Sequence, residues 1–353
     1  MSEPATRFAV GPKDRGKRLD RFLHERIPGL SRTRIQRAIE ERVTLSWGVS
    51  PRAATPVMPG GEVAVAPRRT DETPLDLHLP ILARGGDWLA VDKPSGIPVH
   101  PVHRVLENSL IRILRRQEGD AGLRLAHRLD AETSGVLLVC RTPATARVLS
   151  LAFHRGEVQK EYLAIVAGVV RGAEGTIALP IGDAIGSRVF ERRESGHGQP
   201  SRTDWWVEQR MADRTLLRVF PRTGRRHQIR VHLAAIGHPI LGDLLYGRPD
   251  DDYLSRLRGG GDPRRLDCGP TRHMLHCARL EFADPEGGGQ LSVEAPLPPD
   301  LGERLVDPTG SVDPVGPCSA DHPRLRSPGS PARAGTASSV ELDGTHPIPK
   351  ARG

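Results

Sequence analysis

The sequence has few cysteines and no long hydrophobic run, and each shortage excludes a class of protein. Four cysteines in 353 residues are too few and too scattered for a disulfide framework. No uninterrupted apolar run approaches the roughly 20 residues that a membrane-spanning helix needs. The first residues also lack the apolar stretch of a secretory signal. We therefore expect a protein of the reducing cytoplasm that has no membrane partner.

Basic residues are in excess, and most of the excess lies in one block near the N-terminus. The formal net charge is +8. Residues 15–69 hold eleven arginines and one lysine against five acidic residues, which is nearly the whole excess. A guanidinium group can pair with phosphate through two N–H groups, so this block is suited to contact with nucleic acid. The chain length predicts two folded units plus tails.

Within the basic block, the spacing of apolar residues predicts two helices and two short strands. A first helix is expected over residues 19–27, where the sequence Pro-Gly then stops it. Ser31 is expected to cap a second helix whose apolar stripe faces the core. Arg34 and Arg37 point away from that stripe, toward solvent or a ligand. The strands are expected at residues 43–45 and 62–65.

Outside this block the chain divides into a large central region and three segments without clear periodicity. Residues 81–301 contain many short strands with Gly/Pro turns and a few helices, a pattern typical of an α+β fold. Strands are expected at 88–92, 136–140, 162–166, 216–220, 274–282 and 291–294, and helices at 109–117, 145–153 and 228–236. We expect a flexible N-terminus over 1–14, a linker over 70–80 and a disordered tail over 302–353.

The stretch LRLAHRLDAETSGVLLVCRT places charged residues directly before a strongly apolar strand. Asp130 and Arg128 lie in the charged cluster, and a turn of small residues follows them. Reactive groups are often held on a loop that a rigid element supports, so Asp130 is a candidate catalytic carboxylate. In the alternative interpretation, Asp130 closes a turn and Arg128 is a solvated neighbour.

The stretch LLRVFPRTGRRHQIRVHLAAIGHPILGDLLYG places arginines at the start of a helix. Arg225 and Arg226 precede the helix, and Arg230 lies within it. Arginines at a helix N-terminus can bind phosphate or carboxylate. Alternatively, the first two are solvated and Arg230 pairs with a nearby acid. The histidines here, and the group Cys268, His273, His276 and Cys277, do not have the spacing of a usual zinc site, so we expect no metal.

These stretches, together with VDKPSGIPVHP and the tripeptide Lys160-Glu161-Tyr162, resemble the motifs of RluA-type pseudouridine synthases. HRLDAETSG resembles their HRLDxxTSG signature, and RTGRRHQIRVHL resembles their GRxHQIRxH motif. GHPILGDLLYG and LHCARLEFADP resemble the segments that follow, and the order agrees across residues 81–301. The block at 15–69 resembles the S-four-type RNA-binding domain that precedes many of these enzymes. The resemblance implies a pseudouridine synthase fold, a large mixed, mainly antiparallel sheet flanked by helices and loops, preceded by a small α+β domain.

The resemblance also implies roles for single residues. Asp130 would be the catalytic carboxylate, Arg230 the cation that keeps it ionised, and Tyr162 the ring that stacks on the flipped base. Arg128 would fill the gap in the RNA or hold a phosphate, and Leu275 would contact the base. Without the resemblance, Tyr162 would be interpreted as a core tyrosine of a strand. The residues expected to contact RNA elsewhere are Arg18, Ser31, Arg32, Arg34, Arg37, Arg225 and Arg226.

The implied activity is the isomerisation of uridines to pseudouridine in RNA, with 23S ribosomal RNA favoured over tRNA. The carboxylate could attack the anomeric carbon or remove a ribose proton, and the sequence leaves both routes open. The reaction is redox-neutral and consumes nothing, so we expect no cofactor, and we expect a monomer. The alternatives are a synthase that acts on tRNA and a non-catalytic RNA-binding or ribosome-assembly protein. The motifs of a zinc deaminase and of a methyltransferase are missing from the sequence.

Overall fold

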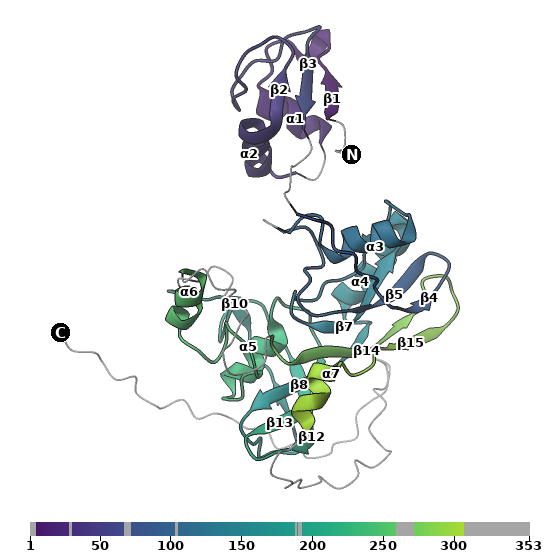
Figure 1. The fold of residues 1–353 in the computed structure, drawn as a ribbon, viewed down its shortest axis with the longest axis vertical. Coiled ribbons are helices and arrows are strands. Elements are labelled where there is room, and N and C mark those ends of the chain that lie inside the picture. Colours follow the sequence, from purple (N-terminus) through teal and green to yellow (C-terminus); the bar gives the residue numbers. More distant parts are fainter. Residues whose placement is uncertain are drawn as a thin grey trace, which may run out of the picture. The chain divides into compact units, whose positions relative to one another are not determined.

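The computed structural model describes residues 5–27, 30–66, 72–102, 105–187, 189, 193–258 and 272–306. It divides into two compact units, which meet in sequence between Asp71 and Glu72 (Figure 1). In the part of the chain that is described, no helix has the length and apolar character needed to cross a membrane. The expected helix stop at residues 28–29 lies outside the described residues.

The N-terminal unit is a three-stranded antiparallel sheet with two helices. The strand order is β1-β3-β2, and the elements are β1 (Thr6–Ala9), the 3-10 helix η1 (Pro12–Asp14), α1 (Leu19–Arg26), α2 (Arg32–Arg42), β2 (Val43–Leu45) and β3 (Glu62–Val65). Phe22, Ile35, Ile39 and Val63 are almost fully buried and form its core. The Ser31 hydroxyl accepts the N–H of Arg34 at 3.4 Å, so the predicted cap of the second helix is confirmed.

The prediction of a flexible N-terminus over residues 1–14 is wrong for the residues that the structure describes. β1 pairs with β3, with Phe8 opposite Val63, and η1 follows it. Most side chains of β1 are exposed, so its pairing depends on backbone hydrogen bonds. Such a strand leaves no alternation of apolar and polar residues in the sequence.

The prediction of a linker over residues 70–80 is also wrong for residues 72–80, which pack against the second unit. Leu79 is fully buried in the core of that unit. The backbone N–H groups of Leu75 and Leu79 donate to the side-chain oxygens of Asn108 and Gln117, each at 2.8 Å. An extended segment held by side chains in this way has no periodic pattern, which is why the sequence resembled a linker.

The second unit is built on one ten-stranded sheet. Its strand order is β4-β5-β7-β14-β8-β13-β12-β9, with β6 added to β7 and β15 added to β14. Of the described pairings only β7 with β14 is parallel, so the predicted mixed, mainly antiparallel sheet is confirmed. The strands are β4 (Ile81–Arg84), β5 (Trp88–Lys93), β6 (Arg124–Leu125), β7 (Ser134–Cys140), β8 (Gln159–Ala167), β9 (Glu174–Ile177), β12 (Thr203–Arg210), β13 (Arg214–Pro221), β14 (Leu275–Ala283) and β15 (Gln290–Glu294). A separate hairpin joins β10 (Ile181–Asp183) to β11 (Arg193–Ser195).

Helices flank this sheet, and one of them carries Arg230. They are α3 (Leu110–Glu118), α4 (Pro143–Arg155), α5 (Gln228–Ala235), α6 (Asp250–Arg258), α7 (Pro299–Gly302) and the 3-10 helix η2 (Glu303–Leu305). α4 packs on β6 and β7, and α5 packs on β12 and β13 (Figure 1). The prediction of disorder from residue 302 is wrong for residues 302–306, because η2 continues from α7 and Leu301, directly before them, is fully buried. The rest of that prediction, from residue 307, lies outside the described residues.

The start of β7 approaches β14 so closely that only glycine fits there. Gly135 has a φ of 108°, and a Cβ atom at this position would lie 2.1 Å from the carbonyl oxygen of Cys277. No other residue type combines that conformation with so little space. The glycine of the Thr-Ser-Gly turn therefore fixes the loop before β7 against β14, which is the loop that carries Asp130.

Candidate active site

Asp130 lies in the loop between β6 and β7, and a buried lysine donates hydrogen bonds to the backbone of this loop. Lys93, at the end of β5, is fully buried. Its ammonium group donates hydrogen bonds of 2.7–2.8 Å to three backbone carbonyl oxygens, those of Pro94, Ala131 and Thr133. Burial lowers the pKa of Lys93 to about 7, and the carboxylate of Asp130 partly opposes this shift. These bonds fix the backbone on both sides of the loop in one conformation.

Arg230, on α5, connects the Asp130 carboxylate to a second carboxylate. Its Nη1 donates to Oδ2 of Asp130 at 2.9 Å. Its Nε and Nη2 donate to the two oxygens of Asp243, at 2.6 and 2.8 Å. The side chains of Arg230 and Asp243 are 7% and 0% exposed, whereas that of Asp130 is 20% exposed. The structure therefore brings together the two predicted residues Asp130 and Arg230, and it leaves Asp130 accessible.

The charges around Asp130 keep its carboxylate ionised. Burial would raise the pKa of Asp130, but His227, Arg230 and His273 together outweigh burial and hold this pKa well below its usual range. Burial lowers the pKa of His227 itself to about 3, so its ring is neutral near pH 7. The permanent positive charge in direct contact with Asp130 is therefore that of Arg230.

His227 is a second neighbour of Asp130 that the sequence analysis did not select as a functional residue. Its Nε2 lies 3.8 Å from Oδ1 of Asp130, and its Nδ1 lies 2.8 Å from the hydroxyl oxygen of Tyr246. His227 is the only described non-glycine residue with a positive φ, at 57°. Tyr246 in turn accepts the backbone N–H of Arg193 at 3.0 Å. The segment GHPILGDLLYG, noted in the sequence, therefore supplies both Asp243 and Tyr246 to the site.

Tyr162 and Leu275 lie on adjacent strands beside this cluster. Tyr162 is opposite Cys277 in the pairing of β8 with β14, and Leu275 is opposite Ala164. Burial, the Cys277 thiol and the charge of Asp130 raise the pKa of Tyr162 well above its usual value, so its phenol keeps its proton. Leu275 is 4% exposed and belongs to the core. Within the described residues, no hydrogen bond or ion pair joins either side chain to Asp130.

The same region of the chain matches known proteins. Residues 87–235 match the family described as RNA pseudouridylate synthase, and this match includes Asp130, Tyr162 and Arg230. The chain is 34% identical to ribosomal large subunit pseudouridine synthase C of Escherichia coli (strain K12) over 304 residues, which is 82% of this chain and 92% of that protein. The chain belongs to the RluA-type RNA pseudouridine synthases. The synthase is therefore grouped with isomerases that act on RNA.

Two further relatives of the synthase carry related names. It is 35% identical to ribosomal large subunit pseudouridine synthase D of Xylella fastidiosa (strain Temecula1) over 300 residues, which is 82% of this chain and 88% of that protein. A solved structure titled human RNA pseudouridylate synthase domain containing 1 is 30% identical, covers 64% of this chain and 86% of its own, and has a TM-score of 0.48.

The predicted RNA-contacting arginines of the N-terminal unit differ in their exposure and in their pairing with carboxylates. Arg18 donates two hydrogen bonds, of 3.1 and 2.9 Å, to the buried carboxylate of Asp20. Arg32 is 74% exposed and lies 3.7 Å from the same carboxylate. Arg37 pairs with Glu41 on the surface of α2 at 2.7 Å. The exposed Arg34 side chain has no ion pair among the described residues. The charge most available to a ligand is therefore on the exposed face of α2.

The arginines that precede α5 are partly buried, and a glutamine organises the start of this helix. The side chain of Gln228 accepts hydrogen bonds from the Thr223 hydroxyl at 2.6 Å and from the Arg225 N–H at 3.0 Å. The Nε of Arg225 donates to the carbonyl of Pro200 at 3.2 Å, and Arg226 is also partly buried. The Arg128 side chain, by contrast, is exposed and makes no hydrogen bond or ion pair within the described segments.

His273 and His276 have separate hydrogen-bond partners. His273 bonds the Thr133 hydroxyl at 2.8 Å, and His276 bonds the Ser134 hydroxyl at 2.9 Å. Among the residues that the structure describes, no three His, Cys, Asp or Glu side chains gather as a metal site would require. Cys268 lies outside those residues.

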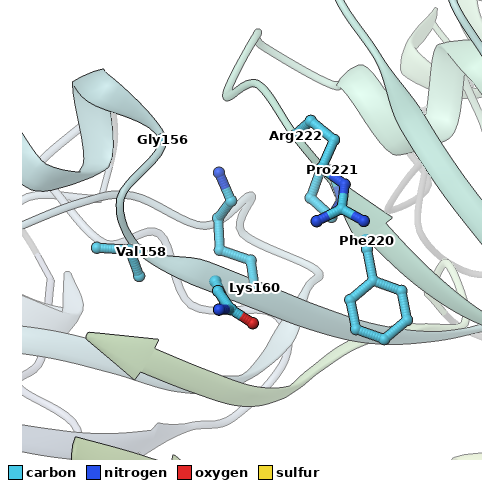
Figure 2. A pocket seen from close by; sticks show the side chains of 7 residues that line it. Gly156, Val158, Lys160, Phe220, Pro221 and Arg222 are labelled. Carbon is cyan, nitrogen blue, oxygen red and sulfur yellow. The ribbon is translucent and has the colours of Figure 1, made fainter. Parts of the chain in front are cut away.

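A small hollow lies at the ends of β8 and β13, beside the C-terminus of α4. Its volume is about 40 Å³, and Figure 2 shows the Lys160 side chain rising from β8 between the Gly156 turn and Arg222. The ammonium group of Lys160 donates to the carbonyl of Thr223 at 3.4 Å, and burial lowers the pKa of Lys160 to about 8. A hollow of this size holds water-sized groups and is too small for a nucleoside. It does not include Asp130.

Proposed function

We propose that the synthase isomerises uridines of large-subunit (23S) ribosomal RNA and that Asp130 is its catalytic carboxylate. The observation that supports the carboxylate is the contact of Asp130 with Arg230 at 2.9 Å on a loop that leaves Asp130 20% exposed. The substrate class follows the names of the relatives, synthases C and D of the ribosomal large subunit. These two names differ, so they support the ribosomal subunit and no single uridine.

The two oxygens of Asp130 have different tasks in this proposal. Oδ2 accepts the hydrogen bond from Arg230, whereas Oδ1 has no hydrogen bond from the described residues. The reaction breaks the bond from N1 of uracil to C1′ of ribose and forms one from C5 to C1′, and the proton lost from C5 is balanced by one gained at N1. An ionised Oδ1 can attack C1′ or remove the proton from C2′, and both routes remain open. Either route requires the ionised carboxylate that Arg230 maintains.

The remaining side chains of the catalytic unit would hold the flipped nucleotide. Tyr162 would lie under the uracil ring, because a stacked ring tolerates rotation of the base better than directed hydrogen bonds do. Leu275 would add an apolar contact to the base. Arg128 would fill the gap in the RNA or bind a phosphate, since its side chain is exposed and has no hydrogen bond or ion pair within the described residues.

The N-terminal unit would bind structured RNA through the exposed face of α2, as an S-four-type domain. Contacts to phosphate carry most of the affinity of such surfaces and make it depend on salt. The residues assigned to RNA contact are those predicted from the sequence, Arg18, Ser31, Arg32, Arg34, Arg37, Arg225 and Arg226. Work on ribosomal RNA would place the protein in the cytoplasm, and we predict that it acts as a monomer.

The substrate is tested with RNA from a strain that lacks the gene, labelled with tritium at C5 of uridine. The full-length protein is incubated separately with purified 23S ribosomal RNA, 16S ribosomal RNA and tRNA, and tritium release is measured. We expect release from the 23S RNA alone, with Asp130→Asn protein inactive on every fraction. Release from tRNA alone would overturn the ribosomal assignment, and release by the Asp130→Asn protein would overturn the role of the carboxylate.

A further inference from the structure

His227 and Tyr246 form a chain of polar contacts that ends at the oxygen of Asp130 that Arg230 does not bind. We propose that His227 is a positioning residue for Asp130 and that Tyr246 fixes the tautomer of His227, so that the imidazole N–H is directed at Oδ1. This inference rests on the proposed catalytic role of Asp130.

The hydrogen bonds of Tyr246 select one tautomer of the imidazole. The Tyr246 hydroxyl oxygen accepts the N–H of Arg193 at 3.0 Å, and it lies 2.8 Å from Nδ1 of His227. If the phenol donates its proton to Nδ1, the ring proton of His227 is on Nε2, the atom that faces Asp130. In the other tautomer the phenolic proton would have no acceptor among the described residues, and a lone pair of Nε2 would face the carboxylate. Burial raises the pKa of Tyr246 to about 12, so the phenol keeps the proton that it donates.

The backbone at His227 is held in a conformation that orients the ring. Its φ of 57° lies in the left-handed region, which few non-glycine residues adopt. Such a conformation costs free energy and persists only where the surrounding structure enforces it, as is common at active sites. Here the ring lies edge to face against Tyr246, with 5.8 Å between ring centres, and its side chain is 7% exposed. The strained residue therefore carries the ring that faces the proposed catalytic group.

One carboxylate, that of Asp243, binds Arg230 directly and holds the turn that carries Tyr246, the partner of His227. Asp243 binds Arg230 through both of its oxygens, at 2.6 and 2.8 Å. Its Oδ1 also accepts the backbone N–H groups of Leu245 and Tyr246, at 2.9 and 3.1 Å. The turn that presents Tyr246 to His227 is therefore tied to the group that presents Arg230 to Asp130. Oδ2 of Asp130 then accepts a hydrogen bond from Arg230, and Oδ1 faces the imidazole of His227 without a hydrogen bond.

The separation of 3.8 Å between His227 Nε2 and Asp130 Oδ1 is too long for a hydrogen bond. The N–H group therefore acts on the carboxylate through its dipole and limits the orientations that Oδ1 can take. A positioning role of this kind changes the rate of the chemical step and leaves RNA binding alone, because the ring is buried behind Asp130. A role in packing alone would change stability and leave the rate of the folded enzyme unaltered.

Four single variants and one double variant of the full-length protein separate these roles. Each is assayed for kcat and KM by tritium release from C5-labelled total RNA of a strain lacking the gene. His227→Asn keeps a residue that tolerates the left-handed region but cannot extend a donor to Oδ1. His227→Gln places an amide nearer the position of Nε2, and Tyr246→Phe removes the hydroxyl and keeps the ring. The control is His238→Asn, since the one hydrogen bond of the His238 ring to the described residues is with the carbonyl of Ala167, at 2.9 Å.

We expect His227→Asn to lower kcat about 10-fold or more and Tyr246→Phe to lower it about 5-fold, each with little change in KM. His227→Gln should recover part of the loss, and the double variant His227→Asn/Tyr246→Phe should be no slower than His227→Asn, because Tyr246 acts through His227. Thermal unfolding of each variant identifies losses of kcat that are caused by misfolding. If His227→Asn does not fold, the kcat of Tyr246→Phe alone tests the positioning role.

The inference is overturned if Tyr246→Phe and His227→Asn fold and keep kcat within about twofold of wild type, while Asp130→Asn is inactive. It is also overturned if only KM changes, or if the two losses simply multiply. Activity of the Asp130→Asn protein would instead remove the proposed function, and this inference with it.

Discussion

Replacing Arg230 with methionine should strongly destabilise the catalytic unit. Arg230→Met keeps a long side chain but removes three charge-assisted hydrogen bonds, two to Asp243 and one to Asp130, of 2.6, 2.8 and 2.9 Å. Asp243 is fully buried and would keep its charge without a cation. Removing one partner of a buried ion pair typically costs about 3–5 kcal/mol. For a unit of this size that lowers the melting temperature by on the order of 10 °C.

The pH dependence of the Arg230→Met deficit gives a second test of the same reasoning. In the wild-type protein burial raises the pKa of Asp243, but Arg230 outweighs burial and the net shift is downward. Without Arg230, the two largest contributions that oppose burial at Asp243 are gone, so the folded-state pKa of Asp243 rises above its unfolded value. At a pH between the unfolded-state and the folded-state pKa, the folded state binds more protons than the unfolded state, so the stability of the variant increases as pH falls. The deficit relative to wild type should therefore shrink from pH 7 to pH 5.

The assay is thermal and urea unfolding of the wild-type protein, Arg230→Met and Arg230→Met/Asp243→Asn. In the double variant the uncompensated charge is gone, and the amide oxygen of Asn can still accept the N–H groups of Leu245 and Tyr246. We expect it to be more stable than Arg230→Met. A loss below about 1 kcal/mol for Arg230→Met, or no recovery in the double variant, would show that Asp243 does not depend on Arg230 for compensation of its charge.

Three further outcomes follow from the geometry. Lys93→Met removes the donor to three backbone carbonyls and should cost on the order of 2–4 kcal/mol in urea unfolding, so an unchanged midpoint would contradict it. Tyr162→Phe should retain most activity in the tritium assay, because it keeps the ring. Tyr162→Leu should lower the activity about 5-fold or more, because the stacking ring is gone. Equal losses of activity in the two variants would argue against stacking. Neutralising Arg34 and Arg37 with glutamine should weaken RNA binding and reduce the slope of log K against log salt by about 1.5. The control is Arg52→Gln, at another exposed arginine of the same unit. An unchanged slope would count against the exposed face of α2 as the RNA-binding surface.

The elements with strong apolar patterns were predictable from the sequence. Strands β2 and β3 begin and end at the predicted residues, and the strongly apolar β7 was found within two residues. β12 was missed, because its polar and apolar residues do not alternate cleanly and a bulge interrupts it between Val207 and Gln209. β1 and residues 72–80 were missed because their order comes from backbone pairing and from side chains far along the chain, neither of which leaves a local pattern.

The site was predictable only in part, for a similar reason. Asp130 and Arg230 were selected through their motifs, and the structure confirms that they are in contact although 100 residues separate them. His227, Asp243 and Tyr246 lay within quoted motifs without an assigned role. What connects them is a left-handed residue and a network of contacts across a turn, and periodicity does not encode either feature.

The most direct test of the account compares Asp130→Asn with Asp213→Asn. Asp213 carries an exposed carboxylate in the turn between β12 and β13, so its substitution controls for the loss of one charge from the same unit. Tritium release from C5-labelled 23S ribosomal RNA is measured beside RNA affinity and melting temperature. The account predicts no release by Asp130→Asn, with affinity and folding retained, and wild-type release by Asp213→Asn. Release by folded Asp130→Asn at a rate near that of wild type would contradict it.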